Sequence, residues 1–189
     1  YNILIAQIQT SLEIVFENPE IEPGTSLKVK TILHDQTGVS IKTNSIITIK
    51  DKNNVILQQT EKPADEFLEY PVKYNEPPAE WKIFAVSNQL TSESSFKIKT
   101  KEDAKIELIN KTLIVTNVGN VPYNETLLIK IGEQVENLGV SLGVDQTEKY
   151  VLSAPDGEYA VEVISDGKNK ISAKGVMLTG NAIDVRKAA

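Results

Sequence analysis

His34 is the residue whose type most readily suggests chemistry, since it is the only histidine of the chain and stands beside Asp35. A metal site needs several ligands, and a catalytic triad needs a nucleophile and a group that orients the base. The sequence places neither near His34. It also contains no Cys, which removes thiol nucleophiles and Cys-ligated metals. We therefore predict no catalytic, cofactor-binding or metal-binding residue, no cofactor and no enzymatic activity.

Two acidic loops could be read as calcium sites, at 51–54 (Asp-Lys-Asn-Asn) and at 156–158 (Asp-Gly-Glu). Calcium requires six to eight oxygen ligands. Asp and Asn also dominate turns, because their short side chains accept hydrogen bonds from nearby backbone N–H groups. We expect both loops to be turns.

Two sequons offer a site of covalent modification, Asn110-Lys111-Thr112 and Asn124-Glu125-Thr126. The pattern Asn-x-Ser/Thr is the acceptor of N-linked glycans in secreted proteins. Both triplets flank predicted strands, where a glycan would stand in solvent. We expect glycosylation of Asn110 and Asn124 if the source is archaeal or eukaryotic.

The first ten residues, Tyr1–Thr10, are apolar, uncharged and free of Pro and Gly. Exposed, such a strand is prone to aggregation. It can pair within its own domain, or it can enter a neighbouring subunit as a donor strand. A membrane-proximal remnant is a further possibility. The residues of the possible donor strand are Ile3, Leu4, Ile5 and Ile8.

Trp81 is the only tryptophan and could stack on a sugar. It begins a predicted strand whose apolar residues alternate, which favours a place in the core of a β-sandwich. With 6% aromatic residues, the chain has little material for a carbohydrate-binding platform.

Composition limits the class of protein. The 189 residues carry a net charge of −6 and a pI near 5.0, which argues against nucleic-acid binding. Hydrophobic residues make up 40% of the chain, so it can bury a core. No apolar run reaches the ~20 residues of a membrane helix. The chain starts at Tyr1 rather than Met, which we interpret as a processed product or a fragment of a longer protein.

Short runs of period-two alternation dominate the sequence and predict half-buried strands. Leu27–Leu33 and Phe96–Lys99 are examples, and Pro, Gly, Asp and Asn clusters separate the runs at a spacing typical of sandwiches. No segment has a sustained helical period. We predict an all-β chain.

An internal repeat indicates two domains. Residues 77–86 (PPAEWKIFAV) align without gaps to residues 155–164 (PDGEYAVEVI), so that Pro, Glu, a large aromatic and the apolar alternation coincide. We predict two tandem Ig-like antiparallel β-sandwiches at 11–100 and 101–176. The apolar strand 1–10 precedes them, and an extended tail 177–189 follows.

The turn and strand motifs of residues 11–99 resemble the Ig-like, macroglobulin-type repeats of bacterial and archaeal surface proteins. The motifs are Pro23-Gly24 before an alternating strand, Asp35-Gln36-Thr37-Gly38 after it, Ile49-Lys50-Asp51 and Glu80-Trp81-Lys82-Ile83. The stretch Leu113–Pro122 within residues 104–176 resembles the strand and turn of CARDB-like adhesion modules. Residues 178–183 are similar to the polar link before a membrane anchor in archaeal surface proteins. These resemblances imply a stalk, adhesin or envelope module.

We therefore expect a non-enzymatic structural or adhesive module of an extracellular, archaeal cell-surface protein. One alternative is a filament or surface-layer (S-layer) subunit joined by donation of the N-terminal strand. Another is a polysaccharide-binding accessory domain of a secreted enzyme. Expected partners are other protein domains or copies of the chain, and surface polysaccharide, with a parent protein that is membrane-anchored.

Overall fold

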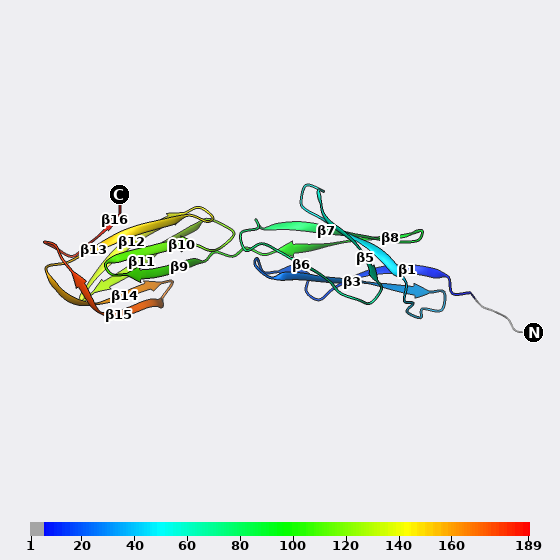
Figure 1. Cartoon of the computed structure of the whole chain (residues 1–189), viewed down its shortest axis with the longest axis horizontal. Coiled ribbons are helices and arrows are strands. Elements are labelled where there is room, and N and C mark those ends of the chain that lie inside the picture. Colours follow the sequence, from blue (N-terminus) through cyan, green and yellow to red (C-terminus); the bar gives the residue numbers. More distant parts are fainter. Residues whose placement is uncertain (1–5) are drawn as a thin grey trace, which may run out of the picture. The chain divides into compact units, whose positions relative to one another are not determined.

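The computed structural model describes residues 6–189 and shows strands joined by turns and loops, with no helix in that range. The chain divides into two compact units, unit 1 up to Thr100 and unit 2 from Lys101 to Ala189. Each unit packs two β-sheets face to face (Figure 1). The predicted all-β fold of two tandem Ig-like sandwiches is confirmed. No part of residues 6–189 forms a helix with the length and apolarity needed to cross a bilayer.

Unit 1 consists of a three-stranded and a five-stranded sheet, in the orders β1-β3-β6 and β2-β8-β7-β4-β5. Consecutive strands cross from one sheet to the other, as β3 to β4 and β6 to β7 do, which is typical of Ig-like sandwiches. The strands are β1 (Gln9–Phe16), β2 (Glu20–Ile21), β3 (Ser26–Asp35), β4 (Asn44–Lys50), β5 (Ile56–Pro63), β6 (Leu68–Pro71), β7 (Ala79–Ser87) and β8 (Leu90–Ile98).

The core of unit 1 follows from the alternation read in the sequence. Leu27, Val29 and Leu33 of β3 are fully buried, because alternate residues of a strand point to the same face. Aromatic rings fill the space between the sheets. Trp81 of β7 lies edge-on to Phe96 of β8, with ring centroids 5.8 Å apart.

The strands of unit 1 pair antiparallel except for β2 and β8, which run parallel. The backbone N–H of Lys97 donates to the carbonyl of Pro19 at 2.8 Å, and the N–H of Lys99 donates to that of Ile21 at 2.9 Å. The opposite end of unit 1 contains the turn from β7 to β8. There Ser87, the last residue of β7, donates to the side chain of Gln9 at 3.3 Å. The polypeptide therefore enters unit 1 at the end near Gln9 and leaves at the opposite end.

Unit 2 consists of two four-stranded sheets, in the orders β16-β13-β10-β9 and β12-β11-β14-β15. The strands are β9 (Ala104–Ile109), β10 (Thr112–Asn117), β11 (Tyr123–Ile131), β12 (Gln134–Leu142), β13 (Thr147–Ser153), β14 (Gly157–Ser165), β15 (Lys168–Leu178) and β16 (Asp184–Lys187).

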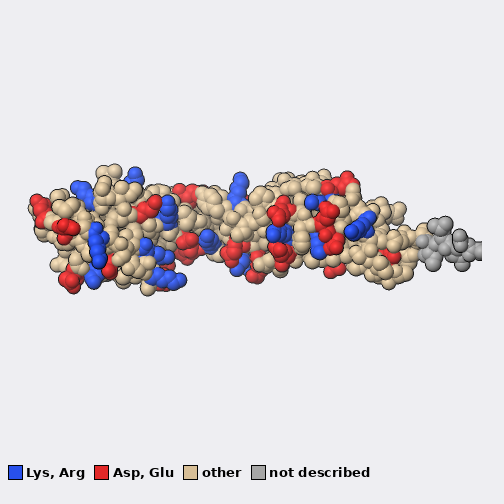
Figure 2. Space-filling model, turned by 60° about the horizontal axis from the view of Figure 1, so that its bottom comes forward, with Lys and Arg blue, Asp and Glu red and all other residues tan. Residues whose placement is uncertain are grey.

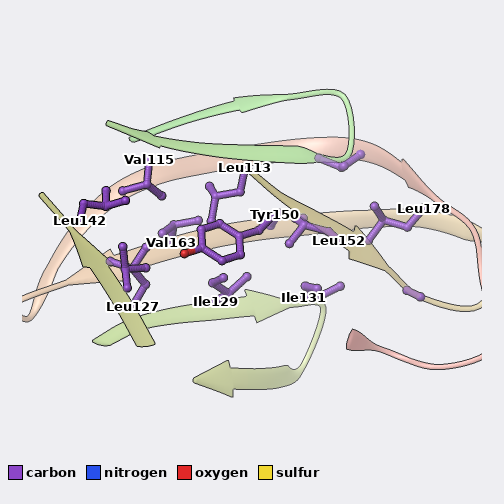
Figure 3. Packing of buried hydrophobic residues seen from close by; sticks show 14 of the residues in the cluster. Leu113, Val115, Leu127, Ile129, Ile131, Leu142, Tyr150, Leu152, Val163 and Leu178 are labelled. Atoms are coloured by element: carbon purple, nitrogen blue, oxygen red, sulfur yellow. The ribbon is translucent and has the colours of Figure 1, made fainter. Parts of the chain in front are cut away.

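The core of unit 2 is mainly aliphatic and contains two buried tyrosines, Tyr123 and Tyr150, of which Tyr150 is labelled in Figure 3. Leu113, Leu127 and Val163 come from different strands and point into the same layer around Tyr150. The hydroxyl of Tyr150 donates to Glu148, and burial of the ring is the main cause that raises its pKa. Burying such side chains is worth about 1.5–3 kcal/mol each, which gives unit 2 a core of its own.

The two copies of the internal repeat occupy the same place in their units. Residues 77–86 lead into β7 between β8 and β4, and residues 155–164 lead into β14 between β15 and β11. Ile83 and Val161, which align in the repeat, are both fully buried. The aligned aromatics differ, since Trp81 is in the core while Tyr159 is half-buried and donates to the carbonyl of Pro155.

The structure corrects the expectation of an extended tail at 177–189. Met177 and Leu178 complete β15, and Leu178 is fully buried. Residues 184–187 form β16, which pairs antiparallel with β13 in the register Tyr150↔Lys187 to Ser153↔Asp184. The Nζ atom of Lys187 donates a hydrogen bond to the carboxylate of Glu148 in β13, which helps to hold β16 against β13. This hydrogen bond is the main cause that lowers the pKa of Glu148.

The N-terminal apolar run falls partly inside unit 1. Gln9 and Thr10 begin β1, which pairs with β3, whereas Ile3, Leu4 and Ile5 lie outside the described residues. Ile8 precedes β1 and is 62% exposed, and its N–H donates to the side chain of Gln36 at 2.8 Å.

Charged side chains of both signs are interspersed over the face shown in Figure 2. Several form exposed ion pairs across neighbouring strands, such as Lys82 with Glu93 at 3.2 Å. Exposed pairs of this kind contribute only about 0–1 kcal/mol each.

Candidate functional site

The structure places His34 and Asp35 at the end of β3, directly before a turn. The Oδ1 atom of Asp35 accepts hydrogen bonds from the N–H and hydroxyl of Thr37 and from the N–H of Val39, at 2.7–3.0 Å. The hydrogen bond from the Thr37 hydroxyl is the main cause that lowers the pKa of Asp35. His34 Nδ1 lies 3.2 Å from the carbonyl oxygen of Gly38. These contacts hold the turn after β3, and across residues 6–189 no three acidic or histidine side chains are grouped to hold a metal ion.

The first acidic loop is also a turn. Asp51 Oδ1 accepts the backbone N–H groups of Asn53 and Val55 at 2.8 and 2.9 Å. Asn54 adopts a φ of 62°, in the left-handed region that Asn tolerates. The aspartate is therefore engaged by its own loop, as expected from the sequence.

Trp81 is 3% exposed and packs between Tyr70 and Phe96. The expectation that it belongs to the core is confirmed. A buried indole presents no face to a sugar, so Trp81 cannot serve as a carbohydrate platform.

A loop motif of unit 2 forms a hydrogen-bonded clasp, which we call the linker clasp: Asn117, Gly119 and Asn120 with Lys101 and Asp103. The N–H of Asn120 donates to the carbonyl of Lys101 at 2.9 Å, and the N–H of Lys101 donates to Asn120 Oδ1 at 2.7 Å. The N–H of Val118 donates to the carbonyl of Asp103 at 3.0 Å. The first residues of unit 2 are thus fixed to its β10–β11 loop.

Asn117 is the centre of the linker clasp and is 1% exposed. Its Nδ2 donates to the carbonyls of Val121 and Gly143 at 2.8 and 3.1 Å, with a longer contact of 3.3 Å to that of Leu142. Its Oδ1 accepts the N–H of Gly119 at 2.9 Å. One side chain therefore joins the β10–β11 and β12–β13 loops.

Gly119 is required by the close approach of two backbones in the linker clasp. A Cβ atom at this position would lie 2.2 Å from the carbonyl oxygen of Lys101 and 2.9 Å from the nitrogen of Asp103. Both partners are backbone atoms, so a side chain can be admitted only by moving the chain. The sequence motif around Gly119 was interpreted only as a strand and turn, and its role in fixing residues 101–103 was missed.

A shallow hollow of about 660 Å³ lies on the exposed face of the sheet β12-β11-β14. We call it the sheet hollow and define it by Asn124, Thr126, Leu128, Gly139, Ser141 and Ile164. It exists because Gly139 stands opposite Thr126 in the β11–β12 register, where a Cβ atom would meet nothing within 4 Å. Its floor is apolar, formed by Ile164 and by Leu128, which is 40% exposed.

The two sequons are in different surroundings. Asn124 and Thr126 lie on one face of β11, since they are two residues apart in a strand, and both are exposed in the sheet hollow. Ser141 donates to Asn124 Oδ1 at 2.6 Å, and the N–H of Asn124 donates to Glu102 at 3.1 Å. Asn110 is exposed in the turn between β9 and β10, with a φ of 55°.

The edge strand β5 of unit 1 exposes apolar side chains. Val55, directly before β5, and Ile56 and Leu57 within it are 55%, 56% and 37% exposed, and among residues 6–189 β5 pairs on one side only, with β4. Residues 55–60 (VILQQT) carry no charge. An uncharged apolar edge is a template for pairing with a further strand.

No protein-family model matches the chain, and no curated protein matches it. Among solved structures, the chain is similar to Salmonella alpha-2-macroglobulin reacted with methylamine, with a TM-score of 0.41 and 12% identity over 90% of the chain. It is also similar to trypsin-activated alpha-2-macroglobulin of Escherichia coli, with a TM-score of 0.44 and 12% identity over 90% of the chain. The chain spans only 15% and 16% of the length of these two proteins. A third similar structure is the Escherichia coli adhesin FdeC, with a TM-score of 0.45 and 13% identity over 93% of this chain and 65% of FdeC. The resemblance of residues 104–176 to CARDB-like modules stays a prediction.

Proposed function

We propose that the chain is a non-enzymatic structural or adhesive module of an extracellular, archaeal cell-surface protein, and that unit 1 acts as a spacer that withstands tension. The observation that carries this proposal is the parallel pairing of β2 with β8. It makes the polypeptide traverse unit 1 from end to end. A spacer needs this path, because a domain whose two ends leave on the same side adds no reach.

The parallel pair also determines how unit 1 responds to a pull on its two ends. The backbone hydrogen bonds from Lys97 to Pro19 and from Lys99 to Ile21 lie across the strands. A force along the strands therefore loads both at once, together with the ion pair between Lys99 and Glu22 at 2.5 Å. Bonds loaded together resist more force than bonds that open in sequence.

Single-molecule force spectroscopy tests the proposal. Because the chain has no Cys, paired cysteine substitutions give unique attachment points. Handles at Ile8→Cys and Thr100→Cys pull unit 1 end to end, whereas handles at Ile8→Cys and Gln89→Cys pull two points near the same end. We expect a higher unfolding force for the first pair. Equal forces for the two pairs would contradict the spacer.

A matched pair of substitutions isolates the β2–β8 contact. Lys99→Pro removes the N–H donor to Ile21 as well as the ion pair, and Lys99→Ala removes the ion pair alone. We expect the end-to-end unfolding force to fall more for Lys99→Pro.

The cell-surface location has its own test, which is antibody labelling of intact cells. Labelling that appears only after permeabilisation would exclude this location.

A second candidate function is a filament or surface-layer subunit, in which the N-terminal run of one copy pairs with the β5 edge of another. The uncharged, exposed residues Val55, Ile56 and Leu57 favour it, as does the exposure of Ile8. A donated strand would satisfy the open side of β5 by main-chain hydrogen bonds. Ile3, Leu4 and Ile5 would supply its apolar side chains.

Light scattering and negative-stain microscopy separate the two candidates. The full chain is compared with residues 9–189, which keep all of β1, and with the variant Ile56→Lys, since a charge blocks edge pairing. Filaments of the full chain that are lost in both variants would establish the subunit. Monomers in all three samples would exclude the filament subunit and leave the spacer as the proposed function.

The third possibility, a polysaccharide-binding accessory domain, would bind through loop residues and an exposed Trp81. Trp81 is buried, so we do not propose this function. The partners that we propose are the neighbouring domains of the parent protein and other surface proteins.

A further inference from the structure

We infer that Asn124 carries an N-linked oligosaccharide whose first sugars lie in the sheet hollow, and that this glycan covers and stabilises the exposed sheet of unit 2. The inference does not depend on the mechanical role proposed for unit 1. It rests on the coincidence of a sequon with a hollow that the fold leaves open beside it.

The acceptor side chain is presented for modification. Asn124 is exposed on β11, and Thr126, the third residue of the sequon, lies beside it on the same face. The hydrogen bond from Ser141 holds Asn124 Oδ1, which leaves Nδ2, the atom that bonds the sugar, directed away from that contact. The bond from the Asn124 N–H to Glu102 fixes the backbone at the attachment point.

The hollow has the chemistry that a sugar ring requires. Leu128 and Ile164 form an apolar floor on which the C–H groups of a pyranose can pack. Hydroxyls of Ser141 and Thr126 stand at its side as hydrogen-bond partners. Its volume of about 660 Å³ falls in the range of about 300–1,000 Å³ typical of small-ligand sites.

Gly139 is the residue that makes room. It lies in the edge strand β12 with its Cβ direction open, so the fold itself tolerates a side chain there. Strand interiors disfavour glycine, which packs nothing and adds conformational entropy to the unfolded chain. A glycine at this point is explained if another group fills the space above it.

Asn110 provides the contrast. It lies in the β9–β10 turn with a φ of 55°, and it does not line the sheet hollow. A glycan on Asn110 would extend into solvent without a surface to pack on. The two sequons thus predict different consequences for the stability of unit 2.

Glycopeptide mapping of the protein isolated from the cells that make it is the first test. Trypsin separates the two sequons, because cleavage after Lys105, Lys111 and Lys130 gives peptides 106–111 and 112–130. We expect peptide 112–130 to carry a glycan on Asn124. A bare mass for this peptide would overturn the inference.

A double-mutant cycle tests whether the glycan packs in the hollow. Produced in the same cells, Asn124→Gln should lower the thermal midpoint of unit 2 by about 4–8 °C, which corresponds to a modest loss of packing. Gly139→Leu fills the hollow, so Asn124→Gln should have no effect in that background. Asn110→Gln is the matched control and should leave the midpoint unchanged. An equal effect of Asn124→Gln with and without Gly139→Leu would refute packing in the hollow, even if the glycan is present.

Discussion

Replacing Asn117 with Ala should selectively destabilise unit 2. The side chain is 1% exposed, and its amide provides two N–H groups and one acceptor to the linker clasp. At about 1 kcal/mol for each hydrogen bond, the loss is about 3 kcal/mol. The N–H of Gly119 is also left in a buried place without its acceptor, which adds to this cost. In a unit of this size, 3 kcal/mol corresponds to a fall of about 12 °C or more in the midpoint of unfolding.

The distribution of aromatic residues makes the assay specific. Trp81, the only tryptophan, is buried in unit 1, so its fluorescence reports the unfolding of unit 1. Far-UV circular dichroism reports both units. In a urea titration of Asn117→Ala, we expect the fluorescence midpoint to stay at the wild-type value, while the part of the dichroism change that belongs to unit 2 moves to lower urea.

The control is Asn137→Ala, which changes the same residue type at an exposed position of β12. It should alter stability by less than about 0.5 kcal/mol. A loss below about 1 kcal/mol for Asn117→Ala would show that the clasp hydrogen bonds are replaced by water. An equal shift of the Trp81 transition would show that the effect is not confined to unit 2.

Three further outcomes are expected. Gly119→Ala should destabilise unit 2 by about 1–3 kcal/mol through its clash with the linker backbone, and Gly139→Ala should not, as measured by dichroism. The folded-state pKa of Asp35 is lowered, so its ionised carboxylate stabilises the folded state. This stabilisation is fully present above the unfolded-state pKa of about 3.9 and is lost as the pH falls through the folded-state pKa. The acid sensitivity of the Trp81 transition should therefore be weaker in Asp35→Asn. Deletion of residues 184–189 should open the β13 edge and cause concentration-dependent association of the chain in light scattering.

Much of the fold could be predicted because its strands bury one face. In β3, the alternation of Leu27, Val29 and Leu33 with polar residues specifies both the strand and its buried side. The repeat that contains Trp81 predicted two units of one architecture, and its two copies form β7 and β14, which occupy equivalent places in their sheets. Turn chemistry likewise predicted the roles of Asp35 and Asp51.

What could not be predicted depends on contacts between distant segments. β16 has four residues and one apolar side chain, Val185, so it carries no period-two signal, and its strand character comes from pairing with β13. The sequon at Asn124 is visible in the sequence, but the hollow beside it requires Gly139 and Ile164 from two other strands. Asn117 reads as a polar turn residue, and only the approach of the β12–β13 loop explains its burial.

The position of β16 also affects how the protein is made. Of the strands of unit 2, β16 is synthesised last, yet it supplies the outer neighbour of β13. Unit 1 contains all its strands by Ile98 and can fold while unit 2 is still emerging, since domains generally fold in order during synthesis. Until Asp184–Lys187 arrive, the nascent unit 2 displays an open sheet edge. A translation product that stops shortly before residue 184 would contain the other strands of unit 2 and yet retain this edge, which makes it a substrate for chaperones and quality-control proteases.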